Sequence, residues 1–341
     1  MSGMSAAISA LALGREPAPD ALEAAFDALM EGEADPVEIG GFLMAMAAVG
    51  ESPQALAVGA RAMRARMTPV AAPSGAIDTC GTGGDAQGTW NISTAAALVA
   101  AGAGAVVAKH GNKAASSKSG SAEVLEAVGV NLFATPEQIE TSLETAGVAF
   151  LFAPAHHGAV RHVGPARRTL GVRTIFNLLG PLSNPAGAKR QLLGVFDRKW
   201  LRPMAEALRD LGAERALVVH GADGLDEMTT TGPTHVAELT ASGGIEEYDV
   251  SPEDAGLPRA APGDLKGGEP AENAHALNAL LDGAPSAYRD IVVLNAAAAL
   301  KLAGLADDLE SGARLASAAI DDGRAREALN DLKSASHGDG A

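Results

Sequence analysis

Residues 78–121 read DTCGTGGDAQGTWNISTAAALVAAGAGAVVAKHGNKAASSKSGS, and this stretch determines how the rest of the chain is interpreted. It begins with a glycine turn at 81–85, where the missing side chains let backbone N–H groups approach a ligand and permit positive φ. Asn91, Ser93 and Thr94 then offer side chains able to cap a helix before an alanine-rich run. The turn therefore leads into a helix N-terminus, whose dipole favours an anion, and the pattern predicts a phosphate-binding loop.

A second polar loop follows within the same stretch. A short apolar run at 105–108 predicts a buried parallel strand, which ends on the sequence KHGN at 109–112. The next loop, KAASSKSGS at 113–121, places lysines and serines at the start of an expected helix. Ligands of open parallel sheets bind beyond the carboxyl ends of the strands. The sequence therefore predicts two anion-binding loops at neighbouring strand ends.

The distribution of charge supports this interpretation. The chain carries 42 Asp and Glu against 26 Lys and Arg, a net charge of −16, yet no acidic residue lies between Asp85 and Glu123. A second gap without Asp or Glu extends from Thr145 to Phe196. It contains three histidines and six other basic residues, Arg161, Arg167, Arg168, Arg173, Lys189 and Arg190. We interpret both gaps as regions kept positive to receive a small polyanion.

Composition excludes several classes of protein. A net charge of −16 with only 3% aromatic residues argues against nucleic acid as a partner. A single cysteine excludes an internal disulfide. No run approaches the roughly 20 apolar residues of a membrane span, and the N-terminus lacks the basic lead of a signal peptide. We therefore expect a cytoplasmic protein with no membrane partner.

Residues 1–68 are predicted to form an N-terminal helical domain. Asp35-Pro36-Val37-Glu38 and Ser52-Pro53 are helix starts with a capping side chain and a first-turn proline. Between them, apolar residues recur at helical spacing along one face. These faces either cover the next domain or meet a second copy in a dimer, and the sequence leaves both possibilities open. The proline-containing segment 68–76 is a predicted linker.

From residue 76 to 333, short apolar runs alternate with helical patterns, which predicts an α/β domain with a mostly parallel sheet. Strands are expected near 105–108, 148–153, 191–195 and 216–220. Helices are expected after Thr135, within 157–182 with a break at Gly171 and an end at Gly180, and over 270–281, 290–305 and 306–332. Residues 232–270 are expected to form an irregular excursion with a hairpin, and 334–341 a disordered tail.

A third candidate site is the sequence HGADGLDE at 220–227. It follows an expected strand and ends in Asp226 and Glu227, adjacent carboxylates suited to Mg²⁺ that is shared with substrate phosphates. A plain surface turn is the competing interpretation. Cys80 is either a nucleophile beside a helix N-terminus or a small buried residue, and the sequence places no base beside it.

Six blocks of the chain together resemble the anthranilate phosphoribosyltransferase family. They are DTCGTGGD, TWNIST, KHGNKAASSKSGSAEVLEAVG, FLFAPAHHGAVRHVGPARRTLGVRTIFNLLGPLSNPA, VVHGADGLDEMT and RDIVVLNAAAAL, in this order. The resemblance implies a small N-terminal helical domain, joined by helices from about 162–185 and carrying a homodimer contact, beside a larger α/β domain of the nucleoside phosphorylase and phosphoribosyltransferase class. It also implies transfer of the phosphoribosyl group of 5-phosphoribosyl 1-pyrophosphate to the amine of anthranilate, in tryptophan biosynthesis, with two Mg²⁺ ions.

The resemblance also implies roles for individual residues. Phosphoribosyl pyrophosphate would be held by Gly81, Gly84, Asp85, Thr89, Asn91, Ile92, Ser93, Thr94, Lys109, His110, Gly111, Asn112, Lys113, Ala114, Ala115, Ser116, Ser117 and Ser121. Anthranilate would contact Gly81, His110, Asn112 and Arg167. Mg²⁺ would be positioned by Ser93, Asp226 and Glu227. Lys109 and His110 would act electrostatically, and no residue would act as a covalent nucleophile.

The chain departs from the family pattern at several positions, among them Ala86 in place of a glycine, Trp90 in place of a phenylalanine and Lys113 in place of an arginine. An alanine at 86 is expected to keep its backbone out of the positive-φ region. Two other functions remain open from the residues alone. A pyrimidine nucleoside phosphorylase would not need Asp226 and Glu227 for metal, and a nucleic-acid-binding relative would need a basic face.

Overall fold

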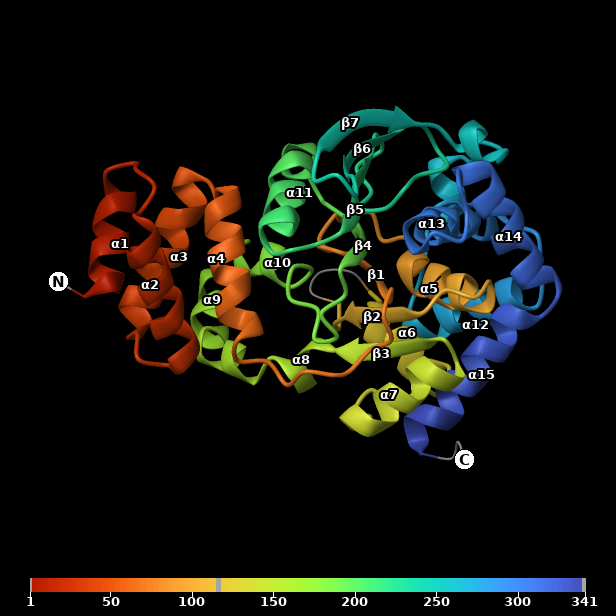
Figure 1. Cartoon of the computed structure of the whole chain (residues 1–341), viewed down its shortest axis with the longest axis horizontal. Helices are drawn as coiled ribbons and strands as arrows, with labels where there is room; N and C mark the ends of the chain where they lie inside the picture. Colours follow the sequence, from red (N-terminus) through yellow and green to blue (C-terminus); the bar gives the residue numbers. More distant parts are fainter. Residues whose placement is uncertain (1, 115–117, 339–341) are drawn as a thin grey trace.

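The structure is a computed structural model that describes residues 2–114 and 118–338. The first four helices form one end of the molecule, and the sheet with its covering helices forms the rest (Figure 1). These helices are α1 (Gly3–Ala12), α2 (Pro19–Glu31), α3 (Pro36–Val49) and α4 (Pro53–Arg64). Asp35 and Glu38 make the expected capping box, and Ser52 Oγ accepts a 3.0 Å hydrogen bond from Ala55 N. Both predicted helix starts are confirmed.

Seven strands form one sheet in the order β3-β2-β1-β4-β5-β6-β7. The first five strands to appear in the chain are mutually parallel, whereas β6 and β7 pair antiparallel at one edge. Their bounds are β1 (Ile77–Gly81), β2 (Val107–Gly111), β3 (Val148–Phe152), β4 (Arg190–Gly194), β5 (Arg215–Gly221), β6 (Thr234–Leu239) and β7 (Ile245–Val250). The predicted mostly parallel sheet is confirmed, and the expected hairpin extends it.

The remaining helices follow the strands. They are α5 (Ile92–Gly102), α6 (Ser121–Ala127), α7 (Pro136–Thr145), α8 (Ala153–His156), α9 (Gly164–Leu170), α10 (Phe176–Leu179), α11 (Leu201–Asp210), α12 (Pro270–Leu281), α13 (Ala287–Ala303), α14 (Leu309–Asp321) and α15 (Arg324–His337). Short 3₁₀ turns lie at Gly158–His162, Arg198–Trp200, Pro252–Ala255 and Pro262–Leu265. None of the helices in the described part of the chain is both long and apolar enough to span a bilayer.

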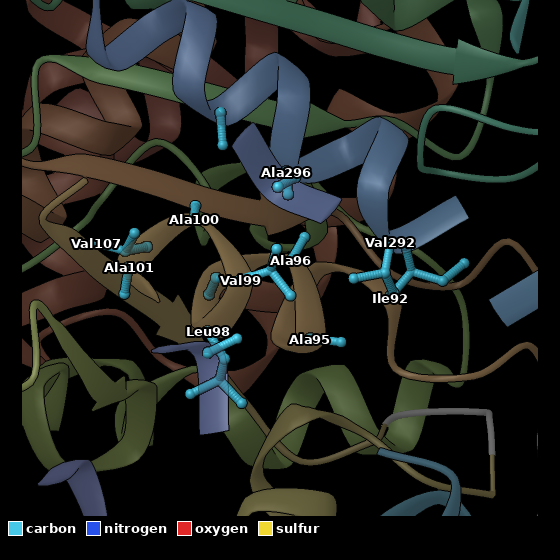
Figure 2. Packing of buried hydrophobic residues seen from close by; sticks show 14 of the residues in the cluster. Ile92, Ala95, Ala96, Leu98, Val99, Ala100, Ala101, Val107, Val292 and Ala296 are labelled. Carbon is cyan, nitrogen blue, oxygen red and sulfur yellow. The ribbon is translucent and has the colours of Figure 1, made fainter. Parts of the chain in front are cut away.

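Both faces of the sheet are buried. Leu192, Leu217 and Val219 pack on α5 and α13, whereas Leu193 and Val218 point the other way, toward α11 and the N-terminal helices. Figure 2 shows the first of these cores, in which the small side chains of α5 let α13 approach closely, with Ala96 near Ala296 and Ile92 near Val292. This packing fixes the position of the N-terminus of α5.

Three expectations about the fold were wrong. Strand β1 was not predicted, because Asp78 and Thr79 are polar although both are fully buried. The helix expected over 306–332 is two helices separated at Gly323, whose φ of +81° suits glycine. The tail expected from 334 is helical through His337, since Ser336 is buried and hydrogen-bonds Asn131. Residues 339–341 lie outside the described residues.

Candidate functional site

The predicted site residues gather at the carboxyl edge of the parallel strands. β1, β2, β4 and β5 run in the same direction, so the turn after Gly81, the segment after Gly111 and the loop after Gly221 leave the sheet at one edge. The chain passes from β1 to β2 on one side and returns to β4 on the other. The gap between β1 and β4 is therefore a topological switch point, where doubly wound sheets bind their ligands.

The loop after β5 closes onto the glycine turn. Asp226 Oδ2 accepts a 2.7 Å hydrogen bond from Gly83 N, and Glu227 Oε1 accepts a 3.0 Å hydrogen bond from Ser93 N at the start of α5. These two segments are more than 130 residues apart in the sequence. The structure thus brings together the predicted phosphate-binding turn and the predicted metal-binding carboxylates.

Glycines at two strand ends make this approach possible. A Cβ at Gly81 would lie 2.5 Å from Asp226 Oδ2, and a Cβ at Gly194 would collide with the carbonyl oxygen of Asp226. Side chains at the ends of β1 and β4 would therefore displace the loop after β5. The need for glycine here comes from close packing, since neither residue has a positive φ.

A buried asparagine holds the same loop from the opposite side. Asn295 lies in the middle of α13 and is fully buried. Its Oδ1 accepts a 3.0 Å hydrogen bond from Met228 N, and its Nδ2 donates 2.9 Å hydrogen bonds to Met228 O and Ile291 O. The main chain directly after Glu227 is therefore fixed to the buried helix α13.

The side chain of Lys109 reaches the first turn of α5. Its side chain is 2% exposed, and its Nζ donates to Thr79 O at 2.5 Å and to Ser93 Oγ at 3.1 Å. Burial lowers the pKa of Lys109, and the nearby Asp78 opposes this shift. The ammonium group thus places positive charge next to the first turn of α5.

Burial and mutual repulsion disfavour the ionised forms of the carboxylates in this site. Burial and the charges of Asp85 and Glu227 hold the pKa of Asp226 well above its usual range. Burial raises the pKa of Glu227 to about 7, although Lys109 opposes the shift. Within residues 2–114 and 118–338, no three His, Cys, Asp or Glu side chains gather closely enough to form a metal cage. This donor set fits Mg²⁺, which keeps several waters and takes one or two carboxylates together with substrate phosphates.

The first turn of α5 offers further donors. Thr94 Oγ1 is buried and, within the described part of the chain, has no hydrogen-bond partner. Asn91 is the N-cap residue, but its side chain does not cap the helix as expected. Its Oδ1 instead accepts from Asn273 Nδ2 at 2.8 Å, and its Nδ2 donates to Ser119 O at 3.3 Å. Asn91 therefore joins the two predicted anion-binding loops.

Other predicted residues differ in how they could reach a ligand. Ile92 is 1% exposed and belongs to the α5 core, so only its backbone is available. Thr89 pairs with Lys266 in an isolated bridge, and Gly84 O accepts a hydrogen bond from Arg173. Asp85 Oδ1 accepts from Gln87 N at 3.2 Å. Gly84, Asp85 and Thr89 lie in the loop between β1 and α5, and Ile92 is the first residue of α5.

The second loop begins at the end of β2. Asn112 and Lys113 are exposed, and Ala114 N donates at 3.2 Å to the carboxylate of Glu123, near the start of α6 at Ser121. Ala115, Ser116 and Ser117, which the resemblance implies in phosphate binding, lie outside the described residues. The described part of the loop curves back to α6 beside Gly111.

Arg167 lies on a different segment from the phosphate-binding loops. It belongs to α9, its guanidinium is 5.3 Å from the ring centroid of Phe176, and its Nη2 donates to Asn177 Oδ1 at 3.5 Å. Arg167 is partly buried, and no carboxylate of the described residues pairs with it. Phe176 and Asn177 belong to α10, and Gly180 follows this helix. Gly180 also contacts the end of β2, since its carbonyl oxygen lies 3.1 Å from His110 Nδ1. Arg167 and His110 therefore flank one segment.

Cys80 is a structural residue. Its thiol is buried, Gln191 Nε2 lies 3.0 Å from Sγ, and burial together with Asp78 raises the pKa well above its usual range. A nucleophilic cysteine needs the opposite shift, toward the thiolate.

The sequence interpretation missed several residues that support the site. They are Asp78, Gln191, Asn273 and Asn295. Asp78 Oδ1 accepts a 3.0 Å hydrogen bond from His110 N, and Gln191 Nε2 donates to Pro181 O at 2.7 Å. For Asn295 a signal did exist, since a polar residue inside the apolar run LNAAAAL must satisfy its hydrogen bonds within the core.

Comparison with known proteins places this site in a family. The model of the "Glycosyl transferase family, helical bundle domain" matches residues 5–67, and that of the "Glycosyl transferase family, a/b domain" matches residues 74–326. The anthranilate phosphoribosyltransferase of Maricaulis maris (strain MCS10) is 61% identical over 97% of this chain and 98% of its own length. That of Parvibaculum lavamentivorans is 56% identical over 99% of both chains.

Solved structures agree. The crystal structure of anthranilate phosphoribosyltransferase from Thermus thermophilus superposes with a TM-score of 0.92 at 45% identity, covering 99% of this chain and all of that one. The Saccharomyces cerevisiae enzyme in complex with PRPP and Mg superposes with a TM-score of 0.91 at 25% identity, over 98% of each chain. The chain described here belongs to the anthranilate phosphoribosyltransferase family, whose members are glycosyltransferases of tryptophan biosynthesis.

Proposed function

We propose that the carboxyl edge of the sheet binds phosphoribosyl pyrophosphate with Mg²⁺, and that anthranilate binds between this edge and Arg167. The family's reaction transfers the phosphoribosyl group to the amine of anthranilate and releases pyrophosphate. The observation that carries the proposal is the closure of Asp226 and Glu227 onto Gly83 N and Ser93 N. It brings two carboxylates, a partly exposed glycine turn and a helix N-terminus next to one another.

The pyrophosphate is assigned to the glycine turn and the first turn of α5. Backbone N–H groups of such turns and of helix N-termini bind phosphate oxygens. The hydroxyl of Thr94 in the first turn of α5 has no partner among the described residues and would add a donor. The buried ammonium of Lys109, which contacts Ser93 Oγ, would add a positive charge. We assign Gly81, Gly84, Asp85, Thr89 and the backbone of Ile92 to this end of the substrate.

Ser93, Asp226 and Glu227 are assigned to Mg²⁺. The raised pKa values of both carboxyl groups support this assignment, because a bound cation would stabilise their ionised forms. When bound, Mg²⁺ would neutralise negative charge on the pyrophosphate. The Saccharomyces cerevisiae relative is described in complex with PRPP and Mg, which supports the metal, and we propose two ions from the family resemblance alone.

The 5-phosphate is assigned to the loop after β2. Gly111, Asn112, Lys113, Ala114 and Ser121 border this loop, and Asn91 ties it to the glycine turn. Ala115, Ser116 and Ser117 complete the assignment from the family resemblance. Because the two loops leave neighbouring strands, one substrate molecule with a phosphate at each end could span them.

Anthranilate is assigned to Arg167, with Asn112, His110 and Gly81. A partly buried guanidinium without a carboxylate partner in the described structure can pair its two parallel N–H groups with the substrate carboxylate. Burial lowers the pKa of Arg167, but a guanidinium stays charged at neutral pH. Arg167 would thus orient the aromatic ring with its amine toward the ribose.

The chain's own residues then contribute position and electrostatics. An aromatic amine is neutral at pH 7, so no protein base is needed to make it a nucleophile. The glycine turn and α5 hold the leaving pyrophosphate, Lys109 stabilises the negative charge that develops on it, and Arg167 orients the amine. No side chain forms a covalent intermediate.

We also propose the domain division and a homodimer. α1–α4 would form the helical domain together with α9 and α10, which pack against α3 and α4 respectively. Val37, Gly41, Met44 and Ala48 form an exposed apolar stripe along α3, at helical spacing. A helix that is apolar on all sides is normally buried, so we propose a second copy on this face. A cytoplasmic location remains a prediction from the sequence.

Substitution of the two carboxylates tests the assignment. Asp226→Asn and Glu227→Gln should each lower kcat by about 10²-fold or more. Each substitution removes a carboxylate charge assigned to hold Mg²⁺ beside the leaving pyrophosphate. The exposed Asp307→Asn serves as a charge-matched control and should behave as the unmodified enzyme. The measurement is initial rate against Mg²⁺ concentration. Full activity of either variant at limiting Mg²⁺ would remove the metal assignment.

A further inference from the structure

Two buried imidazoles lie side by side where the proposed anthranilate site meets the sheet. His110 is the penultimate residue of β2 and is 5% exposed, whereas His157 follows α8 and is 7% exposed. Their ring centroids are 5.1 Å apart, and the two Nε2 atoms are 3.2 Å apart. A hydrogen bond between two ring nitrogens needs a proton on one of them and a lone pair on the other.

The surroundings decide where the protons lie. His110 Nδ1 is 3.1 Å from Gly180 O, and a carbonyl oxygen can only accept, so Nδ1 carries a proton. Burial and the neighbouring imidazoles His157 and His156 hold the pKa of His110 well below its usual range, so the ring is neutral. A neutral ring protonated on Nδ1 has its lone pair on Nε2. His157 Nε2 must then be the donor.

The proton on His157 Nε2 fits the remaining contacts. Burial, with His156, lowers the pKa of His157 to about 4, so this ring is neutral too and its Nδ1 carries a lone pair. Within the described residues that atom is buried without a hydrogen-bond partner. The competing tautomer would direct the His157 proton toward the backbone of Ser183. It would leave two lone pairs facing each other, or require a charged pair.

A charged pair is disfavoured by its neighbours. Lys109 precedes His110, and His156 precedes His157, so two basic groups lie beside the rings. Asp78 is acidic and lies on this side, but its Oδ1 already accepts a hydrogen bond from His110 N. We propose that His157 is a positioning residue that donates Nε2–H to His110 and so leaves His110 with no free lone pair. The anthranilate side of the site then meets a neutral ring that cannot take a proton.

This inference rests on the proposed function, in which His110 borders anthranilate. Without this donor, the lone pair on His110 Nε2 would be free to take a proton, which would make the ring a second cation. It would compete with Arg167 for the substrate carboxylate and turn the amine away from the ribose. His157 would therefore secure a single orientation of the substrate across the physiological pH range.

The experiment compares two substitutions of His157 in the full-length protein. His157→Gln keeps an N–H donor at about the same reach, whereas His157→Leu keeps an apolar side chain and removes the donor. The first readout is ¹⁵N NMR of ring-labelled histidines without ligand, from pH 8 to 5, with the His110 signals assigned by their loss in His110→Gln. The second readout is kcat and KM for anthranilate over the same range.

We expect His110 to stay neutral with its proton on Nδ1 in the unmodified protein and in His157→Gln. In His157→Leu the pKa of His110 should rise relative to the other two, although burial still lowers it, so the ring should gain its second proton at a higher pH. kcat should then fall severalfold more between pH 8 and 6 than in the other two. A His110 proton on Nε2 in the unmodified protein, or identical pH profiles for all three, would overturn the proposal. The NMR readout needs no substrate, so failure of the proposed function would leave it interpretable. If His157→Leu does not fold, the NMR of the unmodified protein still decides.

Discussion

The backbone conformation of Ala86 differs from the one expected from the sequence. An alanine in the glycine turn was expected to avoid positive φ, yet Ala86 has φ of +59° and is the one non-glycine residue with positive φ in the described ranges. For an L-residue this conformation costs about 1–2 kcal/mol. The position follows Asp85, which hydrogen-bonds Gln87 N across it. The fold thus retains the left-handed turn that a glycine would adopt without strain.

Substitution of Ala86 by glycine should therefore stabilise the protein. Relief of the left-handed strain should exceed the entropy cost of glycine, which is about 0.5–1 kcal/mol, and the net gain should be about 0.5 kcal/mol. Ala241→Gly, in the exposed turn between β6 and β7, is a matched control with negative φ and should lose about 0.5–1 kcal/mol. Urea denaturation measures both. An equal loss in the two variants would show that Ala86 is not strained.

At the scale of elements, apolar runs predicted strands and helices well but not the polar strand β1. β2 to β5 and most helices lie within a few residues of their expected ranges. β1 was missed because buried Asp78 and Thr79 satisfy their polar groups through partners that the local sequence does not contain, such as His110 N and Gln191. The closure of the loop after β5 onto the glycine turn likewise depends on strand order, which only the folded chain reveals.

Helix α13 provides an example with a measurable consequence. Asn295→Leu removes three hydrogen bonds and leaves Met228 N and Met228 O buried without partners. We expect a loss of about 3 kcal/mol in the free energy of unfolding, since each buried unsatisfied group costs about 1–3 kcal/mol. The Mg²⁺ concentration for half-maximal activity should also rise, because Glu227 precedes the released residue. Asn278→Leu in α12 is the matched helix control. Unchanged Mg²⁺ dependence in Asn295→Leu would show that α13 does not position the carboxylates.

At the scale of the whole molecule, the exposed stripe of α3 predicts the assembly. Val37 is 83% exposed and Met44 is 40% exposed, on a helix with few charged residues. Exposure of these apolar side chains to water is unfavourable. The purified protein should have twice the chain's mass of 34.2 kDa in light scattering after size exclusion. The double substitution Val37→Lys and Met44→Lys should reduce the mass to that of one chain, whereas Leu305→Lys, at another exposed apolar residue, should not. A single-chain mass for the unmodified protein would remove the dimer.

The most direct test of the account uses the fluorescence of anthranilate. Purified protein is mixed with anthranilate, phosphoribosyl pyrophosphate and Mg²⁺, and loss of fluorescence is followed beside controls that each lack one component. We predict loss only when all components are present, with Asp226→Asn and Glu227→Gln strongly slowed. Loss that persists without Mg²⁺, or that both variants catalyse at the full rate, would contradict the proposal that this edge of the sheet holds the metal and the pyrophosphate.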